Sequence, residues 1–100
     1  MVKHIVMWKF KDSAEGKSRE ENMRIVSESL YSLVGVIGEI KKMEIGEDIS
    51  RTDASMDLVL VTEFESTDAL RSYAVHPEHV KVADYVKKVT ETRKVLDYNM

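Results

Sequence analysis

The sequence predicts a single α+β domain with the element order βαββαβ, the ferredoxin-like arrangement built on an antiparallel sheet. Three observations support this fold class. Strand-like alternating segments and segments of helical periodicity follow one another in that order. A proline divides the second helical segment, and two of the predicted strands are apolar on both faces. The last feature also predicts that two copies of the chain pack sheet to sheet as a homodimeric α/β barrel.

Composition narrows the class of protein. One hundred residues suit one domain, expected over residues 1–100, and 43% apolar content suits a folded chain. The net charge of −3, from 15 basic and 18 acidic residues, argues against a nucleic-acid partner. The absence of cysteine excludes disulfides and thiolate chemistry. Without a signal-peptide pattern or an apolar run of about 18 residues, we expect a cytoplasmic protein with no membrane partner.

The first half of the chain predicts a strand, a helix and a second strand. Residues 2–11 alternate, and one face of this strand carries Val2, His4, Val6, Trp8 and Phe10. Asp12-Ser13 is typical of a helix start, and an apolar stripe between Met23 and Ile37 indicates that the helix continues until glycines end it near residue 38. Residues 39–48 alternate weakly and are expected to form the second strand.

The second half predicts a third strand, a broken helix and a last strand. Residues 56–65 contain a strongly apolar run, and Ser66 can cap the helix that follows. Pro77 disfavours helical geometry at the residue before it and suits the first position of a new helix, so the helical segment is expected to break there. Residues 94–98 are expected to form the last strand.

Two strands carry apolar side chains on both faces. In the first strand Ile5 and Met7 point away from Val6 and Trp8, and residues 58–61 of the third strand are apolar throughout. Because the helices of a βαββαβ unit cover only one face of the sheet, the other face would be left in water. Burying one Ile, Val or Met side chain contributes about 1.5–3 kcal/mol. We therefore expect a second copy of the chain to cover this face.

The segment Tyr73-Ala74-Val75-His76-Pro77-Glu78-His79 is the strongest candidate for a functional site, because it gathers one phenol and two imidazoles around a helix break. If Pro77 opens a helix, His79 lies in its first turn, where the helix dipole lowers the pKa of an imidazole and favours a neutral base. The Tyr73 hydroxyl can donate to a carbonyl or enolate oxygen. His4, on a predicted sheet face, can add a third polar group.

A structural interpretation of the same residues is also open. Tyr73 can be a core aromatic whose hydroxyl binds the backbone, His76 an N-cap, and His79 a surface residue of a first turn. His76 and His79 are spaced as zinc ligands can be, but no third ligand follows at a fixed spacing, so we expect no metal. No glycine-rich phosphate loop or other cofactor motif is present, and we expect no cofactor.

Several segments resemble the stress-responsive dimeric α/β barrel (Dabb) family. The most specific is the pattern Tyr-x-x-His-Pro-x-His-Val over residues 73–80, and the pattern His-x-x-x-x-Lys-Phe-Lys over residues 4–11 supports it. Phe64-Glu65-Ser66 and Leu96-Asp97-Tyr98 follow the family in the same order. The resemblance covers nearly the whole chain, and it implies a ferredoxin-like protomer in a dimer whose sheets pack face to face.

The resemblance also implies a site. Some plant members close a linear polyketide by an aldol condensation without cofactor, and their motif tyrosine and second histidine carry the chemistry, which implies catalytic roles for Tyr73 and His79. The other positions expected to contact a ligand are His4, Val6, Trp8, Val26, Leu30 and His76. The chain departs from those members where Leu58 replaces a histidine and Trp8 replaces a smaller aliphatic residue.

The expected function is therefore that of a stress-associated homodimer that binds a small apolar or carbonyl-containing ligand. The alternative is a cofactor-free cyclase or isomerase, with His79 as the base and Tyr73 as the hydrogen-bond donor. A third possibility is a structural dimer whose core is solid and contains no cavity. The identity of the ligand and of any reaction stays open at this level.

Overall fold

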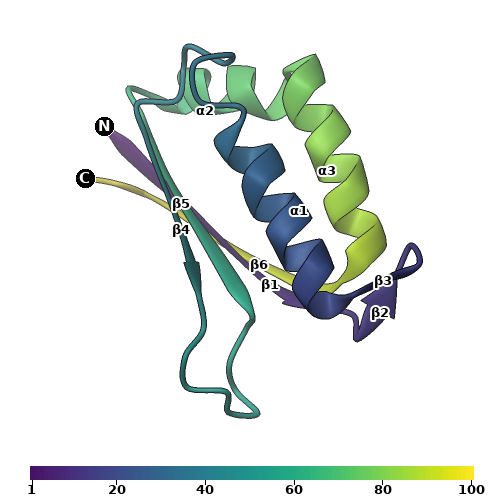
Figure 1. Cartoon of the computed structure of the whole chain (residues 1–100). Helices are drawn as coiled ribbons and strands as arrows, with labels where there is room; N and C mark the ends of the chain where they lie inside the picture. The colour runs from purple at the N-terminus through teal and green to yellow at the C-terminus, as the bar shows by residue number, and fades with distance from the viewer.

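The computed structural model describes all 100 residues, and its three helices lie on one side of a four-stranded antiparallel sheet (Figure 1). The strand order is β4-β5-β1-β6, so β1 and β5 are central. The elements are β1 Val2–Phe10, β2 Ser13–Ala14, β3 Lys17–Ser18, α1 Arg19–Tyr31, β4 Lys42–Glu47, β5 Leu58–Phe64, α2 Thr67–Val75, α3 Pro77–Val89 and β6 Thr90–Asn99. The predicted ferredoxin-like fold class is confirmed. None of these helices has the length and apolar character needed to cross a bilayer.

The core lies between the helices and the covered face of the sheet. The register of β1 and β5 places Val6 opposite Leu60 and Trp8 opposite Leu58, and all four side chains are buried. Helix α1 packs the buried Val26 against this layer. Every second side chain of the strands and the apolar side of α1 therefore face each other and form one apolar layer. This arrangement follows from the side-chain period of two residues in a strand and 3.6 in a helix.

The first helix begins later than predicted. Asp12-Ser13 does not start it, because the short β2–β3 hairpin intervenes and turns through Glu15 and Gly16 at φ values of 52° and 73°. The N-cap is Ser18, whose hydroxyl accepts a hydrogen bond from the Glu21 N–H at 3.2 Å. A helix cannot run through Glu15 and Gly16 at positive φ, so the start after Asp12-Ser13 is blocked and Ser18 provides the next cap.

The first helix also ends earlier, and the last strand begins earlier, than predicted. Helix α1 stops at Tyr31, and residues 32–39 form turns in which Leu33 and Ile37 are nonetheless buried. These two side chains extend the apolar stripe beyond the helix itself. Strand β6 begins at Thr90 instead of residue 94, which places four more residues on the sheet.

The predicted helix break is confirmed. The Ser66 hydroxyl accepts from the Ala69 N–H at 3.1 Å and caps α2. Pro77 occupies the start of α3, and the His76 ring accepts from the Glu78 N–H at 3.1 Å. Helices α2 and α3 therefore meet at an angle instead of forming one continuous helix (Figure 1).

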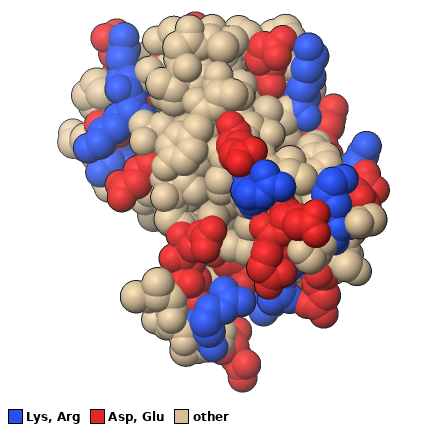
Figure 2. All heavy atoms as spheres, viewed as in Figure 1, with Lys and Arg blue, Asp and Glu red and all other residues tan.

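The surface carries both charge signs. On the face shown in Figure 2, acidic and basic side chains are interspersed and form no continuous basic stripe. This distribution agrees with the small net charge of −3.

Candidate functional site

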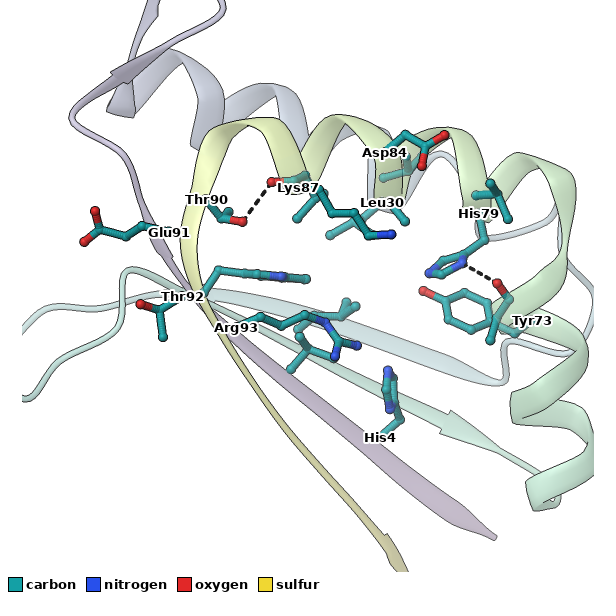
Figure 3. Close-up of a pocket in the computed structure, with 18 residues that line it drawn as sticks. His4, Leu30, Tyr73, His79, Asp84, Lys87, Thr90, Glu91, Thr92 and Arg93 are labelled. Atoms are coloured by element: carbon teal, nitrogen blue, oxygen red, sulfur yellow. Dashed lines mark hydrogen bonds between the residues drawn. The ribbon is translucent and has the colours of Figure 1, made fainter.

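A cavity of about 480 Å³ lies between the covered face of the sheet and α3 (Figure 3). Small-molecule sites commonly have volumes of about 300–1,000 Å³. Strands β1, β5 and β6 form its floor, and α3 with the end of α2 forms its roof. Six of the residues predicted for the site line this cavity: His4, Val6, Trp8, Leu30, Tyr73 and His79. The core is therefore not solid on this side of the sheet.

Two residues predicted to contact a ligand do not line the cavity. Val26 is fully buried in the core beneath α1. His76 uses its ring nitrogen to cap α3, as the structural interpretation of that residue expects. The local sequence pattern indicates a buried position for Val26 and a capping position for His76. It does not indicate the direction in which either side chain points.

Tyr73 and His79 form a contacting pair at one end of the cavity. Tyr73 comes from α2 and His79 from α3, and the break at Pro77 turns the second helix so that the two rings meet. Their ring centroids are 4.3 Å apart with the planes tilted by 46°. Figure 3 shows the tyrosine hydroxyl and one ring nitrogen of the histidine directed into the open space.

The protonation state of His79 follows from its hydrogen bond and its burial. Its Nδ1 lies 2.9 Å from the Ala74 carbonyl oxygen, which can only accept, so Nδ1 carries the proton and Nε2 keeps its lone pair. Burial lowers the pKa of His79; the carbonyl opposes this, while His4, Arg93 and His76 add to it. The predicted direction agrees with the structure, but desolvation, not the helix terminus, is the main cause.

Tyr73 is a neutral donor without a partner. Burial raises its pKa to about 12, against the smaller opposing effect of Arg93. The side chain is 1% exposed, yet its hydroxyl forms no hydrogen bond in the protein. Tyr73 is therefore a core aromatic, as the structural interpretation expects, but its hydroxyl does not bind the backbone. The indole N–H of Trp8, which is 4% exposed, is likewise buried without a partner and belongs to the same cavity.

His4 is held from the edge of the sheet. Strand β6 pairs with β1 so that Asp97 lies opposite His4, and the Asp97 carboxylate contacts His4 Nδ1. The His4 ring meets the Tyr73 ring edge-on at a centroid distance of 6.4 Å. A carboxylate at Nδ1 orients an imidazole and leaves Nε2 available to a ligand.

Sequence reasoning missed Arg93, Lys87 and Thr90, which also line the cavity. Arg93 was overlooked because the last strand was expected to begin one residue after it. Extending the alternation of β6 backwards from Asp97 through Val95 would have placed Arg93 on the same face. Lys87 lies near the end of α3 and Thr90 at the start of β6. Sequence periodicity changes there from helical to strand-like, so it does not predict where these two side chains point.

The fold and the site define a class of protein. It is a ferredoxin-like α/β-barrel protomer whose sheet has one face covered by helices and one open face, with a Tyr–His cavity beneath the helices. The family model of the stress responsive A/B barrel domain (Dabb) matches residues 2–100. The chain belongs to this family.

Relatives share this architecture over almost their whole length. The chain is 28% identical over 99 residues to olivetolic acid cyclase from Cannabis sativa, covering 97% of this chain and 94% of the cyclase. It is 29% identical over 99 residues to a stress-response A/B barrel domain-containing protein from Arabidopsis thaliana, covering 97% and 87%. A solved dimeric protein of unknown function and ferredoxin-like fold from Bacteroides fragilis superposes with a TM-score of 0.87 at 30% identity, covering 99% and 95%.

Proposed function

We propose that this protein binds a small carbonyl compound in the cavity between the sheet and α3. The observation that carries the proposal is the pair of buried donors, the Tyr73 hydroxyl and the Trp8 indole N–H, which line the cavity without a partner. Leaving a buried donor unpaired costs about 1–3 kcal/mol. A carbonyl oxygen accepts hydrogen bonds and donates none, so it complements these groups and removes that cost.

The His79 geometry favours a second candidate function, cofactor-free proton abstraction next to the carbonyl. The lone pair of Nε2 takes a proton from the carbon alpha to the carbonyl. The C–H electrons form the enolate double bond, and the carbonyl electrons move to oxygen, where the Tyr73 hydroxyl stabilises the charge. The lowered pKa of His79 keeps the base unprotonated in the resting protein. The similarity to olivetolic acid cyclase supports this class of chemistry.

Exchange of alpha protons tests both functions without knowledge of the natural substrate. Acetophenone is incubated with the protein in D₂O, and loss of its methyl proton signal is followed by NMR. His79→Gln should reduce the protein-dependent exchange rate by about 100-fold, because one general base typically contributes that much. Tyr73→Phe should reduce it by about tenfold, because one hydrogen bond to the developing oxyanion is lost.

The matched control is His76→Asn. Asn preserves an N-cap acceptor for α3, and His76 lies outside the cavity and is the smallest of the named influences on the His79 pKa, so exchange should stay within about twofold of the wild-type rate. Exchange that survives His79→Gln would remove the enzyme candidate. If acetophenone shifts the Trp8 indole signal but does not exchange, the protein binds carbonyl compounds without catalysis. If it does neither, the proposed carbonyl site is wrong.

We further propose that the working form is a homodimer formed through the open face of the sheet. Its centre is a row of apolar side chains, with Val61 opposite Ile5 and Leu96 on the other side of Ile5. Met7 and Leu96 on this face are 39% and 61% exposed in the single chain. The Bacteroides relative, described as dimeric, supports this arrangement.

The cellular setting remains a prediction. The stress-response name of the Arabidopsis relative supports a stress-associated role, and a cytoplasmic location stays an expectation from the sequence. Measured transcript or protein levels after heat or oxidant treatment would test the first point, and fractionation would test the second.

A further inference from the structure

We propose that the ligand of the cavity is an anionic carbonyl compound whose carboxylate is held by Arg93. This inference rests on the proposed carbonyl-binding function and specifies its substrate class. It assigns a specificity-determining role to Arg93, which lies on the last strand.

The strand register directs Arg93 toward the cavity. Arg93 is the cross-strand partner of Trp8 and shares the covered face of the sheet with Asp97, the partner of His4. Figure 3 shows its guanidinium extending over the cavity floor toward His4. The positive charge also reaches both members of that pair, since it lowers the pKa of Tyr73 and of His79.

Arg93 has no acidic partner. The chain contains five arginines, and the other four each form an ion pair with an aspartate or glutamate within 4.0 Å. Arg93 forms none, and the guanidinium group prefers to bind carboxylates in pairs of parallel hydrogen bonds. An arginine that lines a cavity and lacks an internal counter-ion can receive a carboxylate from a ligand.

The other charged groups of the cavity wall reinforce this preference. Lys87 also has no ion-pair partner, and its side chain runs beneath α3 toward the cavity centre in Figure 3. The two acidic lining residues, Asp84 and Glu91, point away from the interior in the same view. The carboxylate of Asp97 is engaged with His4. The charge facing the bound molecule is therefore positive.

The ligand brings two groups to the cavity. Its carboxylate pairs with Arg93, the cross-strand partner of Trp8. Its carbonyl oxygen accepts from the unpartnered Tyr73 hydroxyl and Trp8 indole N–H, as proposed above. A keto acid satisfies all three donors, whereas a neutral ketone leaves Arg93 without a partner.

Two probes of equal shape test the inference: 4-oxo-4-phenylbutanoate and its primary amide, 4-oxo-4-phenylbutanamide. Binding is followed by the indole N–H signal in a ¹⁵N–¹H spectrum, which is unambiguous because Trp8 is the only tryptophan. The keto acid should bind the wild-type protein about tenfold more tightly than the amide, the usual gain from a charge-assisted hydrogen bond.

Substitution of Arg93 should remove this preference. Arg93→Gln should weaken keto acid binding by about tenfold and change amide binding by less than about twofold. Lys87→Gln should weaken the acid by only about two- to threefold, because an ammonium group meets a carboxylate as a point charge, without the paired hydrogen bonds of a guanidinium. The matched control is Arg24→Gln, which removes the same charge from an exposed i,i+4 pair on α1 outside the cavity, and it should change neither affinity.

The outcomes separate the two proposals. Equal binding of acid and amide by the wild-type protein would overturn the anion subsite and leave the carbonyl site standing. An equal loss of acid affinity in Arg24→Gln would also overturn it, because net charge rather than Arg93 would then be responsible. If neither probe moves the Trp8 signal, carbonyl binding in this cavity is wrong, and the anion subsite is wrong with it.

Discussion

The two faces of the sheet carry different kinds of residue although they are built from the same strands. On the face covered by helices, polar groups are set among apolar ones, and each either has a partner, as His4 has Asp97, or is directed into the cavity. On the open face, the two central strands carry apolar side chains around Ile5 and Val59. Charged residues flank them on the edge strands, as Lys94 does opposite Met7 and Glu44 opposite Val61.

This difference shows how a small domain can separate recognition from assembly. The covered face leaves a space that its own side chains do not fill, and it keeps unpaired donors there. The open face has no such donors, and its cavity, lined in part by Met7 and Val59, is smaller, at about 310 Å³. It offers instead an apolar surface that water solvates poorly. Substitutions on the open face should therefore change dimer formation and leave the cavity intact, and substitutions on the covered face should do the reverse. The following predictions test that separation.

The largest effect is expected from Val59→Asp on the open face. Val59 lies opposite Met7 at the centre of the proposed dimer interface, and each dimer would bury two unpaired carboxylates. The dimer dissociation constant should rise by at least about 100-fold, corresponding to a buried-charge cost of several kcal/mol. Sedimentation of both proteins at micromolar concentration measures this.

The control for that experiment is Val36→Asp. Val36 is 57% exposed in the turns after α1, away from the open face, so this variant should remain dimeric. A wild-type protein that sediments as a stable, folded monomer would contradict the proposed interface and the separation of tasks built on it.

The next effect is expected from Asp97→Ala on the covered face. Removing the carboxylate leaves the Nδ1 proton of the buried His4 without an acceptor, so the free energy of unfolding should fall by about 1–3 kcal/mol. Asp53→Ala, in an exposed loop, should change it very little. Urea unfolding compares the variants, and an equal loss in both would show that Asp97 does not support His4.

The substitutions Tyr85→Phe and Tyr73→Phe remove the same hydroxyl group but should differ in their effect on the free energy of unfolding. Tyr85 donates to the buried Asn22 side chain at 2.6 Å, so Tyr85→Phe should lower the unfolding free energy by about 1 kcal/mol. Tyr73→Phe removes an unpartnered hydroxyl, so it should leave stability unchanged or raise it by up to about 1 kcal/mol. A clear destabilisation by Tyr73→Phe would reveal a structural hydrogen bond and weaken the carbonyl-binding proposal.

The smallest effect is the pH dependence that His79 contributes. Its pKa is lowered in the folded protein from an ordinary value of 6.5, and His4, His76 and Arg93 all act on it. Below about pH 6.5 the unfolded chain therefore takes up a proton more readily, so stability should decline as pH falls. The slope cannot exceed about 1.4 kcal/mol per pH unit for one proton.

His79→Gln should flatten this part of the stability curve and leave the fold nearly intact, since the residue lies at the cavity wall. An NMR titration of the ring protons in the wild-type protein gives the pKa directly. A value at or above 6.5 would contradict both the buried environment of the imidazole and its role as a neutral base.

The sequence by itself determined the order of the helices and of the four strands of the main sheet, the helix break at Pro77 and the apolar character of both faces of the central strands. These features depend on local periodicity and on backbone restrictions that act over a few residues, so they are readable without the fold. The Tyr73–His79 segment was predicted for the same reason, because both residues flank the break that brings their rings together.

Only the tertiary structure decided which other residues reach the cavity. His4 and Asp97 are 93 positions apart and meet only because β6 pairs with β1, and the same pairing places Arg93 beside Trp8. Val26 and His76 matched the expected periodicity but are turned into the core and onto the helix end. The physical reason is that strand register and helix rotation are set by packing across the whole domain, and a one-residue shift in register changes which side chains share a face.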